Sequence, residues 1–130
     1  MKLEELRKVI IVESYMKRWT EDGASWIFND NGTVDVKGNV CTAMNDKFDK
    51  LPFKFRKVHG YFNCGYNDLK TLENCPDVVY GDFYCYNNLL TSLEFAPNIV
   101  TGSFSCQRNS ICFSCQDVKK VCKSYGRIET

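Results

Sequence analysis

The sequence lacks the features that mark membrane-spanning, secreted and nucleic-acid-binding proteins. The aliphatic run near its start, which includes Ile10-Ile11-Val12, is closely flanked by charges and is far too short to span a bilayer. No segment resembles a signal peptide. The 17 basic and 16 acidic residues leave a formal net charge of +1, which provides no long-range field to attract nucleic acid or an anionic membrane. We therefore expect a cytoplasmic protein that contacts no membrane.

Cysteine, by contrast, is abundant, with eight residues in a chain of 130. In a secreted protein an even number of cysteines would indicate a disulfide framework. Because no secretion signal is present, we expect reduced thiols instead. The apolar content of 44% and the charged content of 25% are typical of a soluble globular protein, and the length suits a single domain over 1–130.

The chain also contains an internal repeat of 21 residues. Three segments that begin at Gly60, Gly81 and Gly102 align without an insertion. The matching columns are Val58, Val79 and Val100; Phe62, Phe83 and Phe104; Cys64, Cys85 and Cys106; Asn67, Asn88 and Asn109; Leu69, Leu90 and Ile111; and Leu72 and Leu93. An earlier, degraded copy places Cys41, Ala43, Asp46, Phe48 and Leu51 in the same phases. A fixed period of this length predicts a solenoid.

Each unit is predicted to form one short strand and a return path. Phe-x-Cys has the period-two alternation of a strand with one buried face. The asparagine three residues later ends the strand, because its amide can both donate to and accept from the backbone at the bend. Leucines three apart, such as Leu69 and Leu72, then fill the interior, and the proline of Cys75-Pro76 holds the back wall extended. Stacked units form a continuous parallel sheet over a shared core.

The pattern Asn-x-Leu-x-x-Leu, followed by Pro and the next strand, resembles the short leucine-rich repeats of bacterial proteins. It is most similar to small bacteriophage repeat proteins, whose units read Val-x-Gly-Asp-Phe-x-Cys-x-x-Asn-x-Leu-Thr-Ser-Leu-Glu-x-x-Pro. Residues 79–97 match this unit almost letter for letter, and the resemblance covers about residues 34–113. It implies an α+β, leucine-rich-repeat-like solenoid with parallel strands. Phe and Cys stand where such strands usually carry leucine, and the motifs are specific to fold rather than function.

Both ends of a solenoid expose core and need caps. Residues 1–37 are predicted to form the first cap, residues 38–113 the repeats and residues 114–130 the second cap. The first cap begins with a helix over residues 2–19. Its expected inward face is Leu3, Leu6, Val9, Ile10, Met16 and Trp19. A hairpin from Trp26 to Val36, with an Asn31-Gly32 turn, should then start the sheet.

The second cap is predicted to be a helix from Asp117 to Arg127. Ser114 or Gln116 could begin it, and basic residues suit its far end. Its expected inward residues are Val118, Val121, Cys122 and Tyr125.

Cysteine spacing raises the question of a metal site. The column of Cys64, Cys85 and Cys106 is expected to lie in the core, where cysteine behaves as a small hydrophobe. Cys112-Phe-Ser-Cys115 is a pair spaced as zinc ligands are. The alternative that it raises is a zinc-stabilised structural protein with the ligands Cys106, Cys112, Cys115 and Cys122. A second closely spaced pair is absent, so we expect no metal and no other cofactor.

Residues suited to catalysis are scarce. The single histidine, His59, is replaced by Tyr80 and Thr101 in the other repeats, as expected of a solvated position. No serine or cysteine lies in a nucleophile-elbow context, and the periodic glycines are turn residues rather than a phosphate-binding loop. We expect no enzymatic activity.

The residues that vary between strands point outward and form the candidate binding surface. They are Tyr61, Asn63, Tyr66, Asp82, Tyr84, Tyr86, Gln107 and Arg108. Tyrosine and arginine are enriched at protein interfaces, although tyrosines also favour strand surfaces for their cross-strand packing. We expect a protein-protein interaction module, and the phage resemblance implies an accessory protein that binds a host or phage protein. The alternative is nucleic-acid binding, with tyrosines stacked on bases and a basic C-terminal helix at the phosphates.

Overall fold

The computed structural model describes residues 2–42 and 47–130, so Ala43 and Asp46 of the degraded repeat lie outside the described residues. The elements are, in chain order, α1 (Leu3–Trp19), β1 (Ser25–Phe28), β2 (Val34–Lys37), β3 (Val40–Cys41), β4 (Phe55–His59), β5 (Phe62–Asn63), β6 (Val78–Val79), β7 (Phe83–Tyr84), β8 (Ile99–Val100), β9 (Phe104–Ser105), α2 (Cys115–Val121), β10 (Lys123–Ser124) and β11 (Ile128–Glu129). Within these residues, no helix is long and apolar enough to cross a membrane.

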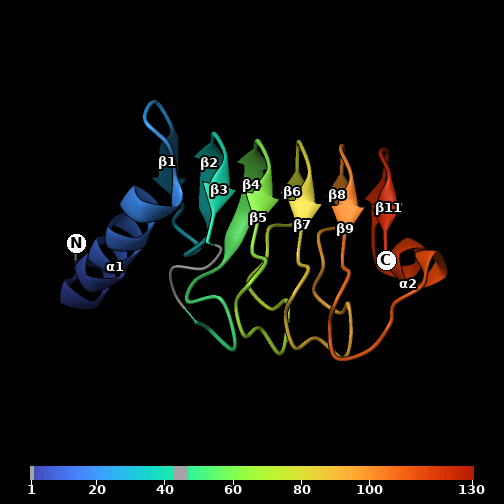
Figure 1. Ribbon diagram of the computed structural model, residues 1–130. Coiled ribbons are helices and arrows are strands. Elements are labelled where there is room, and N and C mark those ends of the chain that lie inside the picture. Colours follow the sequence, from blue (N-terminus) through green and yellow to red (C-terminus); the bar gives the residue numbers. More distant parts are fainter. Residues whose placement is uncertain (1, 43–46) are drawn as a thin grey trace.

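The strands stack into two sheets that run along the length of the molecule. One has six strands in the order β1-β2-β4-β6-β8-β10, and the other has five in the order β11-β9-β7-β5-β3. Neighbouring strands pair in parallel except β1 and β2, which form an antiparallel hairpin. The chain is therefore a parallel β-solenoid of about four turns (Figure 1). The predicted solenoid is confirmed, but each repeat supplies two short strands where we expected one, because the Val-x-Gly segment pairs as well.

Glycine marks the corner where each turn passes from the first sheet to the second. A Cβ atom added to Gly81 would lie 2.6 Å from the carbonyl oxygen of Gly60, and one on Gly102 would lie 2.8 Å from that of Gly81. Backbones at the corner are thus too close for any side chain. Gly38 and Gly126 extend the same column at the two ends.

The core between the sheets is built from the repeat columns. Phe83 has no exposed surface, and its ring centroid lies 6.2 Å from that of Phe62 and 5.0 Å from that of Phe104. Cys64, Cys85 and Cys106 are also buried, as predicted for core residues. Burial raises the pKa of the Cys85 thiol well above its ordinary value, so this thiol remains protonated.

A ladder of asparagines closes the bend after the second sheet, as the sequence predicts. Asn88 donates to the carbonyl oxygens of Cys64 (2.9 Å) and Cys85 (3.2 Å). Its Oδ1 accepts from the backbone N–H groups of Asn67 (3.2 Å) and Leu69 (3.1 Å). Each asparagine therefore joins its own turn to the preceding one, and at Asn88 both the donor and the acceptor of the buried amide are satisfied.

At the N-terminal end, only the second half of α1 packs on the core. Val12, Met16 and Trp19 are buried, and Trp19 stacks on Phe53 with ring centroids 5.7 Å apart. Of the expected inward face, Leu3, Leu6 and Ile10 are instead exposed by 63%, 45% and 58%. The prediction was wrong for them because the first half of the helix points away from the strands (Figure 1). The hairpin is confirmed, with Gly32 at a φ of 85° in its turn, and it starts the six-stranded sheet.

The degraded first repeat is offset by one residue from the predicted alignment. Val40, not Cys41, pairs with Phe62. Thr42, not Ala43, follows in the cysteine column, since its N–H bonds to Asn63 and its side chain is buried. Further along, Leu51 is buried as predicted. The extra residue therefore lies between Thr42 and Leu51.

The C-terminal cap differs most from its prediction. Helix α2 ends at Val121, and residues 123–129 form β10 and β11 instead of further helix. These strands satisfy the open edges of β8 and β9, which a longer helix would leave unpaired. Ser114 does cap α2, since its hydroxyl accepts from the Asp117 N–H and the Asp117 carboxylate accepts from the Ser114 N–H.

Two further side chains at this end were predicted to point inward but are exposed. Tyr125 is exposed by 60% rather than turned inward, because it lies in the turn between β10 and β11. Ile111 is exposed by 46%, because the chain leaves the repeat path after Ser110, whose N–H still donates to the Leu90 carbonyl. Phe113 is buried at this end instead.

Candidate partner-binding face

The outer surface of the five-stranded sheet carries the residues chosen from the sequence. We call it the tyrosine face. It consists of Tyr61, Asn63, Tyr66, Asp82, Tyr84, Tyr86, Gln107 and Arg108, which lie on or directly beside β5, β7 and β9. Tyr66 and Arg108 are exposed, while the other six are half-buried. Ser105, the outward residue of β9, is buried and adds nothing to the surface.

The four tyrosines of this face form one continuous cluster across neighbouring turns. Ring centroids lie 6.4 Å apart for Tyr61 and Tyr84, 5.7 Å for Tyr84 and Tyr86, and 5.4 Å for Tyr66 and Tyr86. Two of the three contacts are edge-to-face and the third is tilted. The rings therefore contribute to sheet stability by cross-strand packing, and they do not lie flat as a row of open stacking platforms.

Gly65 makes room for Tyr86 within the cluster. A Cβ atom at Gly65 would lie 2.2 Å from Cε1 of Tyr86, so the ring rests against the backbone of the preceding turn. The Tyr86 hydroxyl lies 3.5 Å from the Asn63 amide nitrogen, which can donate to it. Tyr86 is thus held on both its apolar and its polar side.

Asp82 organises the polar part of the face. One of its carboxylate oxygens accepts from the Tyr84 hydroxyl at 2.9 Å, and the other accepts from the Ser103 N–H at 2.8 Å. Burial and the hydrogen bond to Asp82 raise the pKa of Tyr84 to about 12. The phenol is therefore neutral at physiological pH and acts as a donor to the carboxylate.

A groove lies where the tyrosine face meets the asparagine bend, and we call it the bend groove. Its volume is about 560 Å³, and it is lined by Lys47, Tyr66, Asn67, Asp68, Asn87, Asn88 and Arg108. Tyr66, Asn87 and Arg108 share one repeat phase and have left-handed backbones, with φ of 53°, 54° and 55°. Asparagine adopts this conformation readily, but tyrosine and arginine do not.

Two of the groove residues belong to the set predicted from the sequence, and the other lining residues do not. Tyr66 and Arg108 were selected as variable outward positions, whereas Lys47 and Asp68 were not. Lys47 belongs to the offset first repeat, where the alignment gave no guide. Asp68 follows the ladder asparagine, a position that looks like an ordinary solvated bend in the sequence. The sequence does not reveal which positions have a left-handed backbone, because three different residue types, Tyr, Asn and Arg, occupy them.

The opposite face, formed by the six-stranded sheet, carries ion pairs between neighbouring turns. Arg56 donates to Asp35 from Nε at 2.8 Å, and this hydrogen bond lowers the pKa of the Asp35 carboxyl. Lys54 pairs with Asp77 at 2.7 Å. His59, predicted to be a solvated residue, is exposed and stacks on Tyr80 at a centroid distance of 4.5 Å. These contacts hold neighbouring turns together and form no catalytic constellation.

The proposed zinc ligands do not converge. Cys112 and Cys115 are exposed, while Cys106 and Cys122 are buried. Burial raises the pKa of each buried thiol to about 11, which disfavours the thiolate form that binds metal. Among the described residues, no three Cys, His, Asp or Glu side chains are arranged to hold a metal ion. The zinc alternative has no support in this arrangement.

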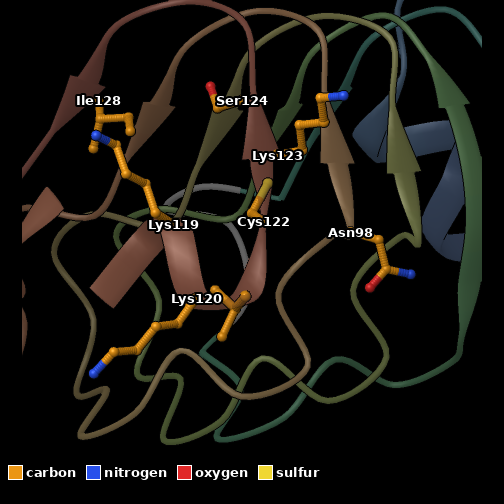
Figure 2. A pocket seen from close by; sticks show the side chains of 8 residues that line it. Asn98, Lys119, Lys120, Cys122, Lys123, Ser124 and Ile128 are labelled. Atoms are coloured by element: carbon orange, nitrogen blue, oxygen red, sulfur yellow. The ribbon is translucent and has the colours of Figure 1, made fainter. Parts of the chain in front are cut away.

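Lysines of α2 and β10 surround a shallow pocket of about 450 Å³ at the C-terminal end. It is lined by Asn98, Lys119, Lys120, Val121, Cys122, Lys123, Ser124 and Ile128. Figure 2 shows the three lysine side chains pointing in different directions, and Lys123 reaches over the Tyr125 ring. An anion in this pocket would meet no converging set of ammonium groups.

Comparison with models of known protein families, with curated proteins and with solved structures gives no match to this chain.

Proposed function

We propose that the protein is a non-enzymatic interaction module that binds another protein through the tyrosine face. Its solenoid is of the leucine-rich-repeat-like kind, and the repeat sequence resembles small bacteriophage proteins. The corresponding role is that of an accessory protein in the bacterial cytoplasm, which acts as an inhibitor of a host factor or binds another phage protein.

The observation that carries this proposal is the exposure of Tyr66 and Arg108 together with their left-handed backbone conformation. Both are exposed on the tyrosine face and both occupy left-handed backbone positions that favour Gly or Asn. The stacked repeat imposes this conformation, since Asn87 of the intervening turn shares it. The presence of Tyr and Arg where Asn would be less strained is therefore what points to a function. Arg108 also forms no ion pair or hydrogen bond through its side chain within residues 2–42 and 47–130, unlike the paired Arg56 and Lys54 on the opposite face. Tyrosine and arginine are the residues that most often anchor protein interfaces.

Nucleic-acid binding remains the alternative function, but the geometry favours it less. The tyrosine rings pack edge-on against one another and offer few free faces for bases. The lysines of α2 and β10 diverge, and the net charge is only +1.

The test is capture of a partner from bacterial lysate by the tagged protein, with and without nuclease. The double variant Tyr66→Asn/Arg108→Asn keeps residues that suit the left-handed backbone, so it should remain folded and lose its partner. Replacing Lys119, Lys120 and Lys123 with Glu should leave that partner bound. Loss of capture on nuclease treatment, or only in the lysine variant, would contradict the proposal and support nucleic-acid binding.

A further inference from the structure

The bend groove has more positive charge than its own residues neutralise. Arg108 and Lys47 line it, and Asp68 is the one acid among its lining residues. Within the described part of the chain, neither cation forms an ion pair, whereas Lys50, Lys54 and Arg56 do. An arginine with its whole guanidinium available provides a planar set of donors that fits a carboxylate with two hydrogen bonds.

The length of the groove limits what can occupy it. Tyr66 and Arg108 lie in the same phase two turns apart, and parallel strands are spaced about 4.8 Å apart, so their backbones are separated by roughly 10 Å. A peptide in the extended polyproline II conformation advances about 3.1 Å per residue with three residues per turn, so side chains three positions apart lie on the same face, roughly 9 Å apart. Tyr66, whose ring is supported edge-on by Tyr86, supplies an apolar contact at one end, and Arg108 supplies the charge at the other.

We infer that the bend groove binds a short extended peptide segment carrying an acidic residue about three positions from an apolar one. The acidic side chain lies at Arg108, with Lys47 adding to the attraction, and the apolar side chain lies against Tyr66. This inference rests on the proposed function and narrows it, because it names the chemistry of the partner segment. A phosphate-bearing strand shares the negative charge, but the packed tyrosine rings favour a peptide over stacked bases.

A random peptide display library tests this directly, without knowledge of the natural partner. Dodecapeptides selected on the immobilised full chain should be enriched in Asp or Glu about three positions from an aliphatic or aromatic residue. Selected peptides, resynthesised with a fluorescent label, should lose at least tenfold in affinity for Arg108→Glu and for Tyr66→Asn, as expected for anchor residues. The matched control is Arg127→Glu, an exposed arginine outside the groove, which should change affinity less than twofold apart from a small long-range charge effect.

Each other outcome has a definite meaning. Peptides that depend on Tyr66 but show no acidic preference, and bind Arg108→Glu normally, overturn the acidic segment and leave the proposed function standing. If no peptide is selected, or if neither variant weakens the binding of the selected peptides, both the acidic-segment inference and the proposed protein-binding role of this surface are contradicted. A labelled single-stranded oligonucleotide serves as the last arm. If it binds in an Arg108-dependent manner while peptides do not, the occupant is a nucleic acid and the inference is wrong.

Discussion

The central turns of the solenoid and its two ends obey different rules. In the central turns every core position has an equivalent 21 residues away, and the side chains of Phe62, Phe83 and Phe104 stack as one column. At the ends the spacing changes to 22 residues from Val40 to Phe62 and to 24 from Phe104 to Ile128. The backbone pairing continues through both changes, but the side chains no longer repeat. Regular stacking fixes the core, while each end uses its own residues to close it.

The largest expected difference concerns aromatic residues of the core. Phe83→Ala removes a fully buried ring between two others, so it should cost about 3–5 kcal/mol. Phe113 is 7% exposed and lies at the C-terminal end of the core, outside the repeat columns. Phe113→Ala should therefore cost less free energy of unfolding. Urea unfolding of both variants measures the two free energies. An equal or greater loss for Phe113→Ala would show that the end, not the centre, limits stability.

A second pair of variants compares the two halves of α1. Met16 has no exposed surface, and Met16→Ala should cost about 2–5 kcal/mol because it leaves a cavity against the first turn. Leu6 is 45% exposed on the half that leaves the core, and Leu6→Ala should stay within about 0.5 kcal/mol of the parent. Thermal and urea unfolding check both values. A Leu6→Ala loss comparable to that of Met16→Ala would mean that the first half of the helix is part of the cap.

The asparagine ladder gives a graded comparison along the solenoid. The Oδ1 atom of Asn88 accepts two backbone N–H groups, whereas that of Asn109 accepts one, from Leu90 at 3.1 Å. The Oδ1 atom of Asn67 has no partner among the described residues. Asn88→Ala should therefore cost the most, about 1–3 kcal/mol for the buried groups it leaves unpaired, and Asn109→Ala distinctly less. Hydrogen exchange of the Asn67 and Leu69 amides should accelerate in Asn88→Ala alone.

The same contrast explains what the sequence could predict. The repeat columns predicted the buried valines, phenylalanines, cysteines and asparagines of the centre, because a periodic solenoid places equivalent residues in equivalent environments. The corner pattern Val-x-Gly was visible too, and it recurs at Val36-Lys-Gly38, one turn before the three full repeats and directly before the degraded copy. Recognising it as a strand and corner would have revealed the second sheet and the true first turn.

The ends and the bend groove were harder to predict for physical reasons. The apolar stripe of α1 continues through Leu3, Leu6 and Ile10, although only the second half of the helix packs on the core. The stripe therefore predicted a longer buried face than the helix has. Gly126 already disfavoured a helix through Arg127, but nothing local in residues 123–129 shows that they pair with the open edges of β8 and β9. The groove depends on backbone angles at Tyr66 and Arg108 that stacking imposes and that their side chains do not favour.

The smallest expected change is the most informative about the tyrosine face. A left-handed backbone costs an L-residue about 1–2 kcal/mol, and asparagine tolerates it better than other non-glycine residues. If Tyr66 and Arg108 serve a partner and not the fold, Tyr66→Asn and Arg108→Asn should leave the free energy of unfolding unchanged or raise it by a few tenths of a kcal/mol. Tyr66→Asn also loses the edge-on contact with Tyr86, so its gain should be the smaller of the two. Gln107→Asn, at a position without positive φ, serves as the control and should show no gain. Chemical denaturation of the three variants is sufficient, and a loss beyond about 1 kcal/mol for Arg108→Asn would assign its side chain to the fold.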